Sequence, residues 1–219
     1  MSKNLIVIGV TGVGRNIAEI VEEIGDEWNL LGYLDDDPGK QGSEINDVPV
    51  LGRIADIAKY DGCYFIVATG TFNKKRIVTK LGMDMRNYAT IIHPTARVSK
   101  SATIGKGSVI FPGVKIMANA DIGNHVCIES QVTMGVDTTI RDYVLVSYSA
   151  TIAGAGGTIE EGCWIGLNSS IRNGIRIGEW SIIGMGSVVV CDVPPHHVVA
   201  GNPAKVLRKL EPAELIRIS

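Results

Sequence analysis

The stretch "TIGKGSVIFPGVKIMANADIGNHVCI", residues 103–128, places an aliphatic side chain at every sixth position. The same period extends from it in both directions. Aliphatic residues stand six apart from Ile92 to Ile152, the chain then steps by seven, and the period resumes from Ile159 to Val189. Seventeen positions in two registers follow this rule, and repetition every six residues is typical of a parallel β-helix.

Each six-residue unit is expected to form one short strand and one turn, with its aliphatic side chain pointing into the column. Three units close a triangular coil, and successive coils stack at about 4.8 Å, the spacing of hydrogen-bonded strands. The step of seven predicts one residue that bulges outward at a corner, where Gly154, Gly156 and Gly157 permit the turn. A neutral insertion and a close approach to a ligand are both compatible with it.

The first part of the chain has a different pattern, in which apolar strands alternate with helices. The predicted strands and helices are, in chain order, residues 4–10, 15–25, 30–37, 64–70 and 71–81. This alternation predicts a small parallel sheet of the α/β, Rossmann-like class, open at the carboxyl ends of its strands. We therefore expect an α/β domain over residues 1–90, an all-β parallel β-helix over 91–205 and a C-terminal tail over 206–219.

Composition argues against several classes of function. The formal net charge is −2 and no block of basic residues occurs, so a nucleic-acid partner is not expected. No apolar run approaches the ~18 residues that span a bilayer, and the apolar stretch of the opening "MSKNLIVIGV" is too short for a signal peptide. The four cysteines form no CxxC pair and are expected to be buried free thiols. We expect a cytoplasmic protein without membrane insertion.

Glycines at the end of the first predicted strand indicate a phosphate site. Gly9, Gly12 and Gly14 open the first helix, whose backbone N–H groups and dipole favour a diphosphate. Their GxxGxG spacing differs from the GxGxxG dinucleotide motif, so a plain tight turn is the alternative. Asp35 lies 21 residues after Gly14, where such sheets place an acid near a ribose, although "DDDPG" also fits a solvated turn.

A second strand end carries polar residues expected at the same edge of the sheet. Thr69, Gly70, Asn73 and Arg76 are predicted to line the same crevice, with Arg76 pairing a phosphate. An Arg76 without a ligand on the helix surface is the alternative.

These features together resemble the hexapeptide-repeat acyltransferases, and within them the nucleotide-sugar acyltransferases of the PglD and NeuD type. Besides the six-residue period, the likeness rests on "GVTGVGRNIAEIV" (9–21), "GYLDDDP" (32–38), "VATGTFNKKR" (67–76), "IIHPTA" (91–96) and "IIGMGSVVVCDVPPHHVVAGNPAKVLRKL" (182–210). The resemblance implies a left-handed β-helix, a homotrimer, acetyl-CoA in a groove between adjacent subunits, and a UDP- or dTDP-linked amino sugar on the N-terminal domain.

The resemblance also assigns binding residues. Those expected at the nucleotide sugar are Gly9, Thr11, Gly12, Gly14, Arg15, Asp35, Asp36, Thr69, Gly70, Asn73 and Arg76. Those expected along acetyl-CoA are Gly154, Gly166, Asn168, Met185, Gly186, Pro203 and Lys205.

Three histidines of the family are missing from this chain. The resemblance puts the catalytic base at Val136 and its orienting acid at Asp137, a second histidine at Leu145, and the histidine of the first glycine turn at Val13. Asp137 is a weak candidate base if partial burial raises its pKa, and a solvated corner aspartate otherwise.

A missing general base slows acyl transfer without forbidding it, because such help is worth typically 10²–10⁴-fold. An amine enters with a neutral fraction, whereas a sugar hydroxyl does not ionise near neutral pH. We therefore expect acetyl-CoA-dependent N-acetylation of a nucleotide-linked 4-amino-deoxyhexose. The alternatives are an impaired homologue that only binds nucleotide sugar or CoA, and an enzyme with another small acceptor such as an amino acid. The spacing of the histidines fits no three-imidazole metal site, so no metal is expected.

Overall fold

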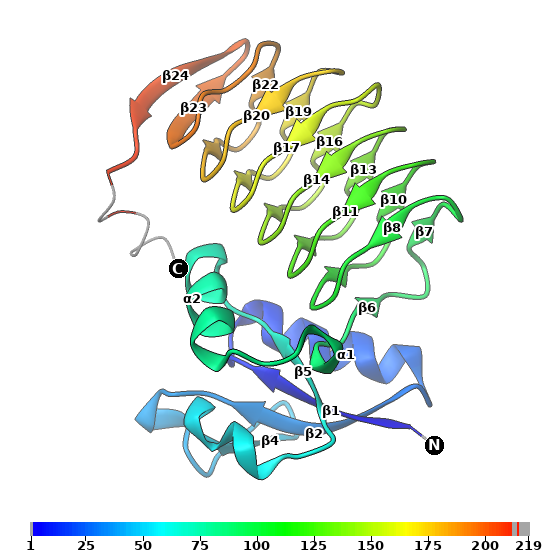
Figure 1. The fold of residues 1–219 in the computed structure, drawn as a ribbon, viewed down its shortest axis with the longest axis vertical. Coiled ribbons are helices and arrows are strands. Elements are labelled where there is room, and N and C mark those ends of the chain that lie inside the picture. Colours follow the sequence, from blue (N-terminus) through cyan, green and yellow to red (C-terminus); the bar gives the residue numbers. More distant parts are fainter. Residues whose placement is uncertain (1, 212–213, 215–219) are drawn as a thin grey trace.

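A computed structural model describes residues 2–211 and 214. Its first part is an α/β domain with a five-stranded sheet of order β3-β4-β2-β1-β5, parallel except for the β3–β4 hairpin (Figure 1). The elements are β1 (Lys3–Ile8), α1 (Gly12–Ile24), β2 (Trp28–Leu34), β3 (Glu44–Ile45), β4 (Val48–Gly52), β5 (Tyr64–Val67) and α2 (Thr71–Leu81). The three predicted strands and two predicted helices are confirmed, whereas β3 and β4 were not predicted.

Helix α1 begins where the glycine turn lets the chain reverse after β1. Gly9 has φ of +101°, a conformation that side chains disfavour, and Thr11 caps the helix by accepting a hydrogen bond from the Gly14 N–H at 3.1 Å. A Cβ on Gly14 would lie 2.3 Å from the Gly9 carbonyl oxygen, so only glycine lets the helix pack this closely on the turn.

Seventeen two-residue strands then wind into the left-handed parallel β-helix, a triangular prism (Figure 1). They are β6 (Ile91–Ile92), β7 (Arg97–Val98), β8 (Thr103–Ile104), β9 (Val109–Ile110), β10 (Lys115–Ile116), β11 (Asp121–Ile122), β12 (Cys127–Ile128), β13 (Thr133–Met134), β14 (Thr139–Ile140), β15 (Leu145–Val146), β16 (Thr151–Ile152), β17 (Thr158–Ile159), β18 (Trp164–Ile165), β19 (Ser170–Ile171), β20 (Arg176–Ile177), β21 (Ile182–Ile183) and β22 (Val188–Val189), and β23 (His197–Gly201) and β24 (Ala204–Lys209) follow them. Its three faces are a six-stranded sheet (β22-β19-β16-β13-β10-β7), a five-stranded sheet (β20-β17-β14-β11-β8) and an eight-stranded sheet (β24-β23-β21-β18-β15-β12-β9-β6). The second residue of each of these two-residue strands is one of the seventeen aliphatic positions, as predicted.

Three edges join these faces, and we number them. Edge 1 joins the eight- and six-stranded sheets, edge 2 the six- and five-stranded sheets, and edge 3 the five- and eight-stranded sheets. In the coil that begins with β12 (Cys127–Ile128), they comprise residues 129–132, 135–138 and 141–144 respectively, and corresponding turns stack above and below them.

The aliphatic column is buried except at its beginning. From Ile110 onward its side chains are at most 3% exposed, but Ile92 is 37% exposed, and Val98 and Ile104 are half-buried. The first coil nevertheless keeps the inward register, because Ile92, Val98 and Ile104 pair with Ile110, Ile116 and Ile122. Its strands β6, β7 (Arg97–Val98) and β8 (Thr103–Ile104) lie at the ends of the three sheets, so only one side of each is covered by another coil.

The step of seven is an outward bulge at edge 2, as predicted. Thr139 of β14 (Thr139–Ile140) pairs with Thr158 of β17 (Thr158–Ile159), one residue more than the usual 18-residue coil. Ala155 and Gly156 take the left-handed conformation there, and a Cβ on Gly156 would meet open space.

A hairpin closes the far end of the prism. Strand β23 (His197–Gly201) pairs in parallel with β21 (Ile182–Ile183), and β24 (Ala204–Lys209) returns antiparallel to it. Pairing thus continues past residue 205, where the tail is expected to begin.

Two expectations from composition concern the cysteines and the membrane. Cys63, Cys127 and Cys163 are buried free thiols, as expected, but Cys191 is exposed because it lies in a turn after the last coil. No helix within the described residues has the length and apolarity needed to cross a bilayer.

The α/β domain docks on the prism through α1 and α2. Apolar side chains of α1 share one core cluster with the coils, and those of α2 belong to a second cluster against which Tyr143 of the prism packs. His93 is a structural, hydrogen-bonded histidine in this contact: Nε2 lies 2.6 Å from Glu23 Oε2 on α1, and Nδ1 lies 2.8 Å from Thr95 Oγ1. On the α2 side, Lys75 forms an ion pair with Glu161 at edge 3. This docking creates the pocket described next.

Candidate functional site

A pocket of about 370 Å³ lies where the N-terminal ends of α1 and α2 meet the eight-stranded sheet; we call it the junction pocket. The α/β domain contributes Thr11, Gly12, Val13, Asn16, Thr69, Gly70, Thr71 and Lys74. The prism contributes Cys127, Glu129, Leu145 and Tyr148. The starts of both helices line this pocket, and the N–H groups and dipole of a helix start favour anions.

Two opposite charges line the junction pocket, and both are buried. Lys74 is 4% exposed, and its Nζ donates to the backbone oxygen of His125 at 3.2 Å. Glu129 is 9% exposed, and its Oε2 accepts from the Tyr148 N–H at 3.2 Å. The two side chains form no ion pair with each other, and neither forms an ion pair with any other side chain of the described chain.

Burial shifts the protonation of these groups in opposite directions. It lowers the pKa of the Lys74 ammonium. It raises the pKa of the Glu129 carboxyl, although the hydrogen bonds from Tyr148 and Ser147 oppose that rise. Burial also raises the pKa of Cys127 to about 11, so this thiol stays protonated and is not a nucleophile near neutral pH.

The structure brings four of the predicted nucleotide-sugar residues into the junction pocket: Thr11, Gly12, Thr69 and Gly70. Gly9 and Gly14 lie beneath them and shape the turn. Arg15 is exposed on α1 and Asn73 is half-buried on α2; neither lines this pocket.

Asp35 has a structural role in this chain. Its carboxylate accepts from the Val10 N–H at 2.7 Å and the Asp37 N–H at 2.9 Å, and it pairs with Lys40 at 3.1 Å. Burial raises the pKa of Asp35, but these donors outweigh it and hold the pKa below its usual value. The solvated turn considered for "DDDPG" is therefore wrong at Asp35.

Asp36 and Arg76 do lie together, but in a different pocket. They line a hollow of about 480 Å³ with Ile54, Ile57 and Lys80. The single crevice expected from the sequence is thus divided by α2, because Lys74 and Arg76 project from nearly opposite sides of this helix.

Val13 and Leu145, two of the three positions where the resemblance implies a histidine, line the junction pocket. Val136, the third, is 45% exposed at edge 2 and lies away from this pocket in the single chain. Asp137 beside it is an exposed corner residue with φ of +57°, and it accepts from Asn119 Nδ2 at 3.0 Å. The partial burial on which its role as a base depends is absent from this chain.

The predicted cofactor residues fall on two edges. Gly166, Asn168, Met185 and Gly186 stack at edge 1, where the Gly186 N–H donates to the Leu167 oxygen at 2.9 Å. Exposed apolar side chains follow the same edge, namely Tyr148, Leu167 and Met185. Gly154 lies at edge 2, and a Cβ on it would lie 2.7 Å from the backbone of Val136. Pro203 and Lys205 belong to the β23–β24 hairpin.

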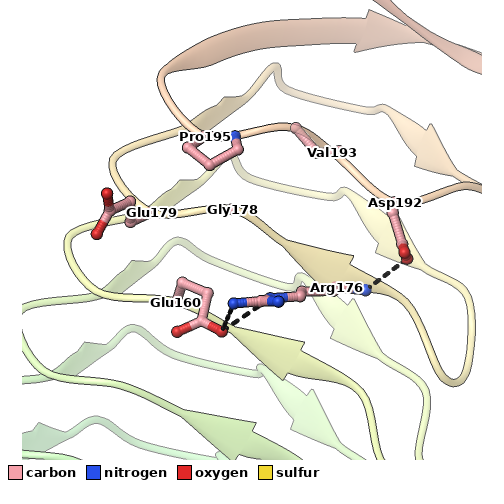
Figure 2. A pocket seen from close by; sticks show the side chains of 7 residues that line it. All are labelled: Glu160, Arg176, Gly178, Glu179, Asp192, Val193 and Pro195. Atoms are coloured by element: carbon pink, nitrogen blue, oxygen red, sulfur yellow. Dashed lines mark hydrogen bonds and ion pairs between the residues drawn. The ribbon is translucent and has the colours of Figure 1, made fainter.

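A second pocket of about 370 Å³, which we call the flank pocket, lies over the five-stranded sheet and edge 3. Figure 2 shows Arg176 between Glu160 and Asp192: its guanidinium pairs with Glu160 Oε1 at 2.9 Å, and its backbone N–H donates to Asp192 Oδ1 at 2.8 Å. The cation is thus already paired. Among the described residues, no group of three or more His, Cys, Asp or Glu side chains is arranged to hold a metal ion.

Sequence reasoning did not single out Lys74, Glu129 or Tyr148. One signal was present. Glu129 follows the aliphatic Ile128 directly, at a position where glycine follows Ile104, Ile122, Ile165, Ile177 and Ile183. Arg141, Glu160 and Arg172 stand at the same position in other coils, so this signal alone does not distinguish Glu129.

Comparisons with known proteins agree with this architecture. The PglD N-terminal domain matches residues 4–81, the bacterial transferase hexapeptide (six repeats) matches 101–135, and the hexapeptide repeat of succinyl-transferase matches 158–191. Serine acetyltransferase 2 of Arabidopsis thaliana is 33% identical over 148 residues, 66% of this chain and 41% of that protein. The chain spans about half the length of the curated relatives it matches.

Solved structures match over nearly the whole chain. The acetyltransferase domain of PglB from Neisseria gonorrhoeae, in complex with acetyl coenzyme A, has a TM-score of 0.85 at 31% identity and covers 94% of this chain and 100% of that one. A variant of perosamine N-acetyltransferase from Caulobacter crescentus, in complex with CoA and GDP-perosamine, has a TM-score of 0.85 at 25% identity and covers 94% of this chain and 97% of that one.

Proposed function

The chain belongs to the hexapeptide-repeat sugar acetyltransferases of the PglD/NeuD type, and we propose that it transfers acetyl from acetyl-CoA to the amine of a nucleotide-linked amino sugar. The observation that carries this proposal is the junction pocket, because it joins the starts of two helices, which suit a diphosphate, to a buried carboxylate, which suits an ammonium.

The proposed acceptor lies across the α/β domain. Its diphosphate meets the N–H groups at the start of α1, beside Gly12, and its amino sugar enters the junction pocket. The hollow with Asp36 and Arg76 is the proposed place of the nucleoside. UDP and dTDP are the carriers expected from the sequence; the Caulobacter relative binds a GDP sugar, so all three belong in the test.

The proposed cofactor groove lies between subunits of a homotrimer. Within one chain the predicted acetyl-CoA residues of the coils fall on edges 1 and 2, so a groove that uses both groups needs edge 1 of one chain beside edge 2 of the next. The exposed apolar stack of Tyr148, Leu167 and Met185 on edge 1 supports an interface there. The N–H of Gly154 has no acceptor within the described chain and is the proposed donor to the thioester oxygen.

Catalysis then depends chiefly on how the amine and the thioester are positioned relative to each other. The prism (91–205) holds the thioester and the α/β domain (1–90) holds the nucleotide of the acceptor, so docking the two brings nucleophile and carbonyl carbon together. Backbone N–H groups stabilise the tetrahedral oxyanion. Synthesis of an activated sugar precursor in the cytoplasm is the setting we propose.

The test is release of free thiol when the protein is mixed with acetyl-CoA and a panel of UDP-, dTDP- and GDP-linked 4-amino sugars. The expected result is release with at least one amino sugar and none with the matching 4-hydroxy sugars. No release above buffer with any of them contradicts the proposal.

The second candidate function is binding without turnover. It is favoured by the apolar residues Val13, Leu145 and Val136 at all three histidine positions. Calorimetry separates the two: tight binding of acetyl-CoA and nucleotide sugar without thiol release supports the second.

A further inference from the structure

An amino-sugar acceptor arrives largely as an ammonium near neutral pH, and its proton must leave before nitrogen attacks the thioester. Val136 has no proton-accepting group, and Asp137 is exposed away from the junction pocket. We propose that Glu129 binds the acceptor ammonium in the junction pocket and takes this proton. This inference rests on the proposed function.

The position of Glu129 directs its carboxylate out of the column. Ile128 points into the core of the prism and is fully buried, so the next residue along the chain points outward, at the start of edge 1. The α/β domain covers this point, which explains why an outward carboxylate is only 9% exposed. What remains open beside it is the junction pocket.

Two donors, the Ser147 hydroxyl and the Tyr148 N–H, fix the carboxylate without using all of its acceptor capacity. Trp164 Nε1 donates to Ser147 Oγ at 3.0 Å, which leaves the Ser147 hydroxyl hydrogen for Glu129. The Tyr148 N–H donates to Oε2 at 3.2 Å. A carboxylate accepts about four hydrogen bonds, so lone pairs remain for an ammonium in the pocket.

The groups around Glu129 favour it over its neighbours as the base. Lys74 from α2 already donates its Nζ to a backbone oxygen, and the thiol of Cys127 stays protonated. The hydroxyl of Tyr148 hydrogen-bonds to Asn16 from α1, and burial raises its pKa. Burial likewise raises the pKa of Glu129, which makes it a stronger base than a solvated glutamate.

The step balances as follows. The ammonium gives one proton to Glu129, and the freed nitrogen lone pair forms a C–N bond with the thioester carbon. The resulting intermediate collapses with cleavage of the C–S bond, and the departing CoA thiolate takes the second nitrogen proton. Glu129 returns its proton to water when the N-acetyl sugar leaves.

The test compares Glu129→Gln, which keeps the shape of the side chain, with Glu179→Gln, which removes an exposed carboxylate of the flank pocket. kcat/KM for the amino sugar is measured from pH 6 to pH 10 at saturating acetyl-CoA. Glu129→Gln is expected to lower it about 100-fold at pH 7, with a defect that shrinks toward pH 10 as free amine enters unaided. Glu179→Gln is expected to stay within about twofold.

A purely structural role would not produce a defect that depends on pH, and calorimetry checks that acetyl-CoA binding is unchanged within about twofold. The inference is overturned if Glu129→Gln keeps the wild-type rate and pH profile. It is also overturned if the pH-dependent defect appears instead in Asp137→Asn or Lys74→Met.

Failure of the proposed function looks different, because wild-type protein then releases no thiol with any sugar. In that event the binding affinity is the test. Glu129→Gln must weaken binding of the amino sugar about tenfold relative to binding of its 4-hydroxy analogue. Equal weakening of both sugars, or no binding of either, removes Glu129 as the amine's partner as well.

Discussion

The junction pocket and the flank pocket have the same volume, about 370 Å³, but they treat charge in opposite ways. In the flank pocket, Arg176 is paired with Glu160 and its side chain is 69% exposed. In the junction pocket, Lys74 and Glu129 are both buried, and neither has an ion-pair partner within the described chain. The two pockets therefore differ in the free-energy cost of the charged groups that line them.

An exposed ion pair costs the folded protein little and contributes little, so its presence says nothing about use. An ionised group that is buried without a counter-ion is expensive, and the protein places two ionisable side chains in that position beside one cavity. Groups of this kind concentrate at sites where a ligand supplies the missing partner. The comparison therefore selects the junction pocket, and the following changes test that choice.

Filling the junction pocket is expected to have the largest effect. Val13→Trp places an indole in the space proposed for the amino sugar, and kcat/KM for the acceptor should fall about 1000-fold, or about 4 kcal/mol. Glu179→Trp fills the flank pocket to a similar extent and should leave kcat/KM within about twofold. Thiol release gives both values, and circular dichroism confirms that the variants fold. Similar losses from the two variants would end the distinction between the pockets.

The loss of stability at low pH is expected to show how well water is excluded from the contact between the α/β domain and the prism. The ring of His125 stacks on Tyr143 and packs edge-on against Tyr88, and neither ring nitrogen has a hydrogen-bond partner among the described residues. Burial, assisted by nearby Lys74, lowers the pKa of His125 to about 4 from 6.5. The folded state therefore holds a neutral ring where the unfolded state binds a proton. This stability is complete above pH 6.5 and is lost as the pH falls toward 4, by about 3 kcal/mol.

His125→Phe keeps the ring contacts and removes the titrating group. Urea unfolding at pH 7, 5.5 and 4 should show wild type losing about 3 kcal/mol more than this variant, because the carboxylates common to both cancel in the difference. Parallel pH curves for the two proteins would mean that water reaches this ring, and the junction would not be the low-dielectric site argued here.

Restoring a histidine at the family's base position gives a smaller and more diagnostic effect. Val136→His in the Glu129→Gln background should raise kcat/KM about tenfold, but by less than about threefold in wild type, because one base then replaces the other. Val136→Leu is the matched control and should rescue neither. Since Val136 and Glu129 lie on different edges of one chain, rescue should require the proposed trimer. An equal gain in both backgrounds would show that the two positions act independently.

The column was predictable from the sequence because its period is local: one aliphatic residue in six fixes strand, turn and inward face together. The period does not say which coil lies at the end of the column, so the 37% exposure of Ile92 was not predictable from it. The meeting of Thr11 with Thr69 was predictable too, since the carboxyl ends of parallel strands share one edge of a sheet.

The junction pocket itself was not predictable. Lys74 and Glu129 line the same pocket only because α2 docks on the eight-stranded sheet, and no periodic signal in the sequence encodes that docking. Arg76 illustrates the same limit. It was expected in the crevice with Gly70, but two residues along a helix turn a side chain through about 200°, which places it with Asp36 in the other hollow.

The smallest expected effect belongs to the flank pocket and is the strictest check on the comparison. Arg176→Gln breaks the ion pair with Glu160 but keeps the hydrogen bond from the backbone N–H of residue 176 to Asp192 Oδ1. Because the guanidinium is largely solvated and screened, the free energy of unfolding should change by less than about 0.5 kcal/mol, and turnover by less than about twofold. Urea unfolding in low and high salt measures the first. A loss above about 1.5 kcal/mol that salt does not reduce would mean that the flank pocket is also organised around its charge, and pairing alone would no longer separate an idle pocket from a functional one.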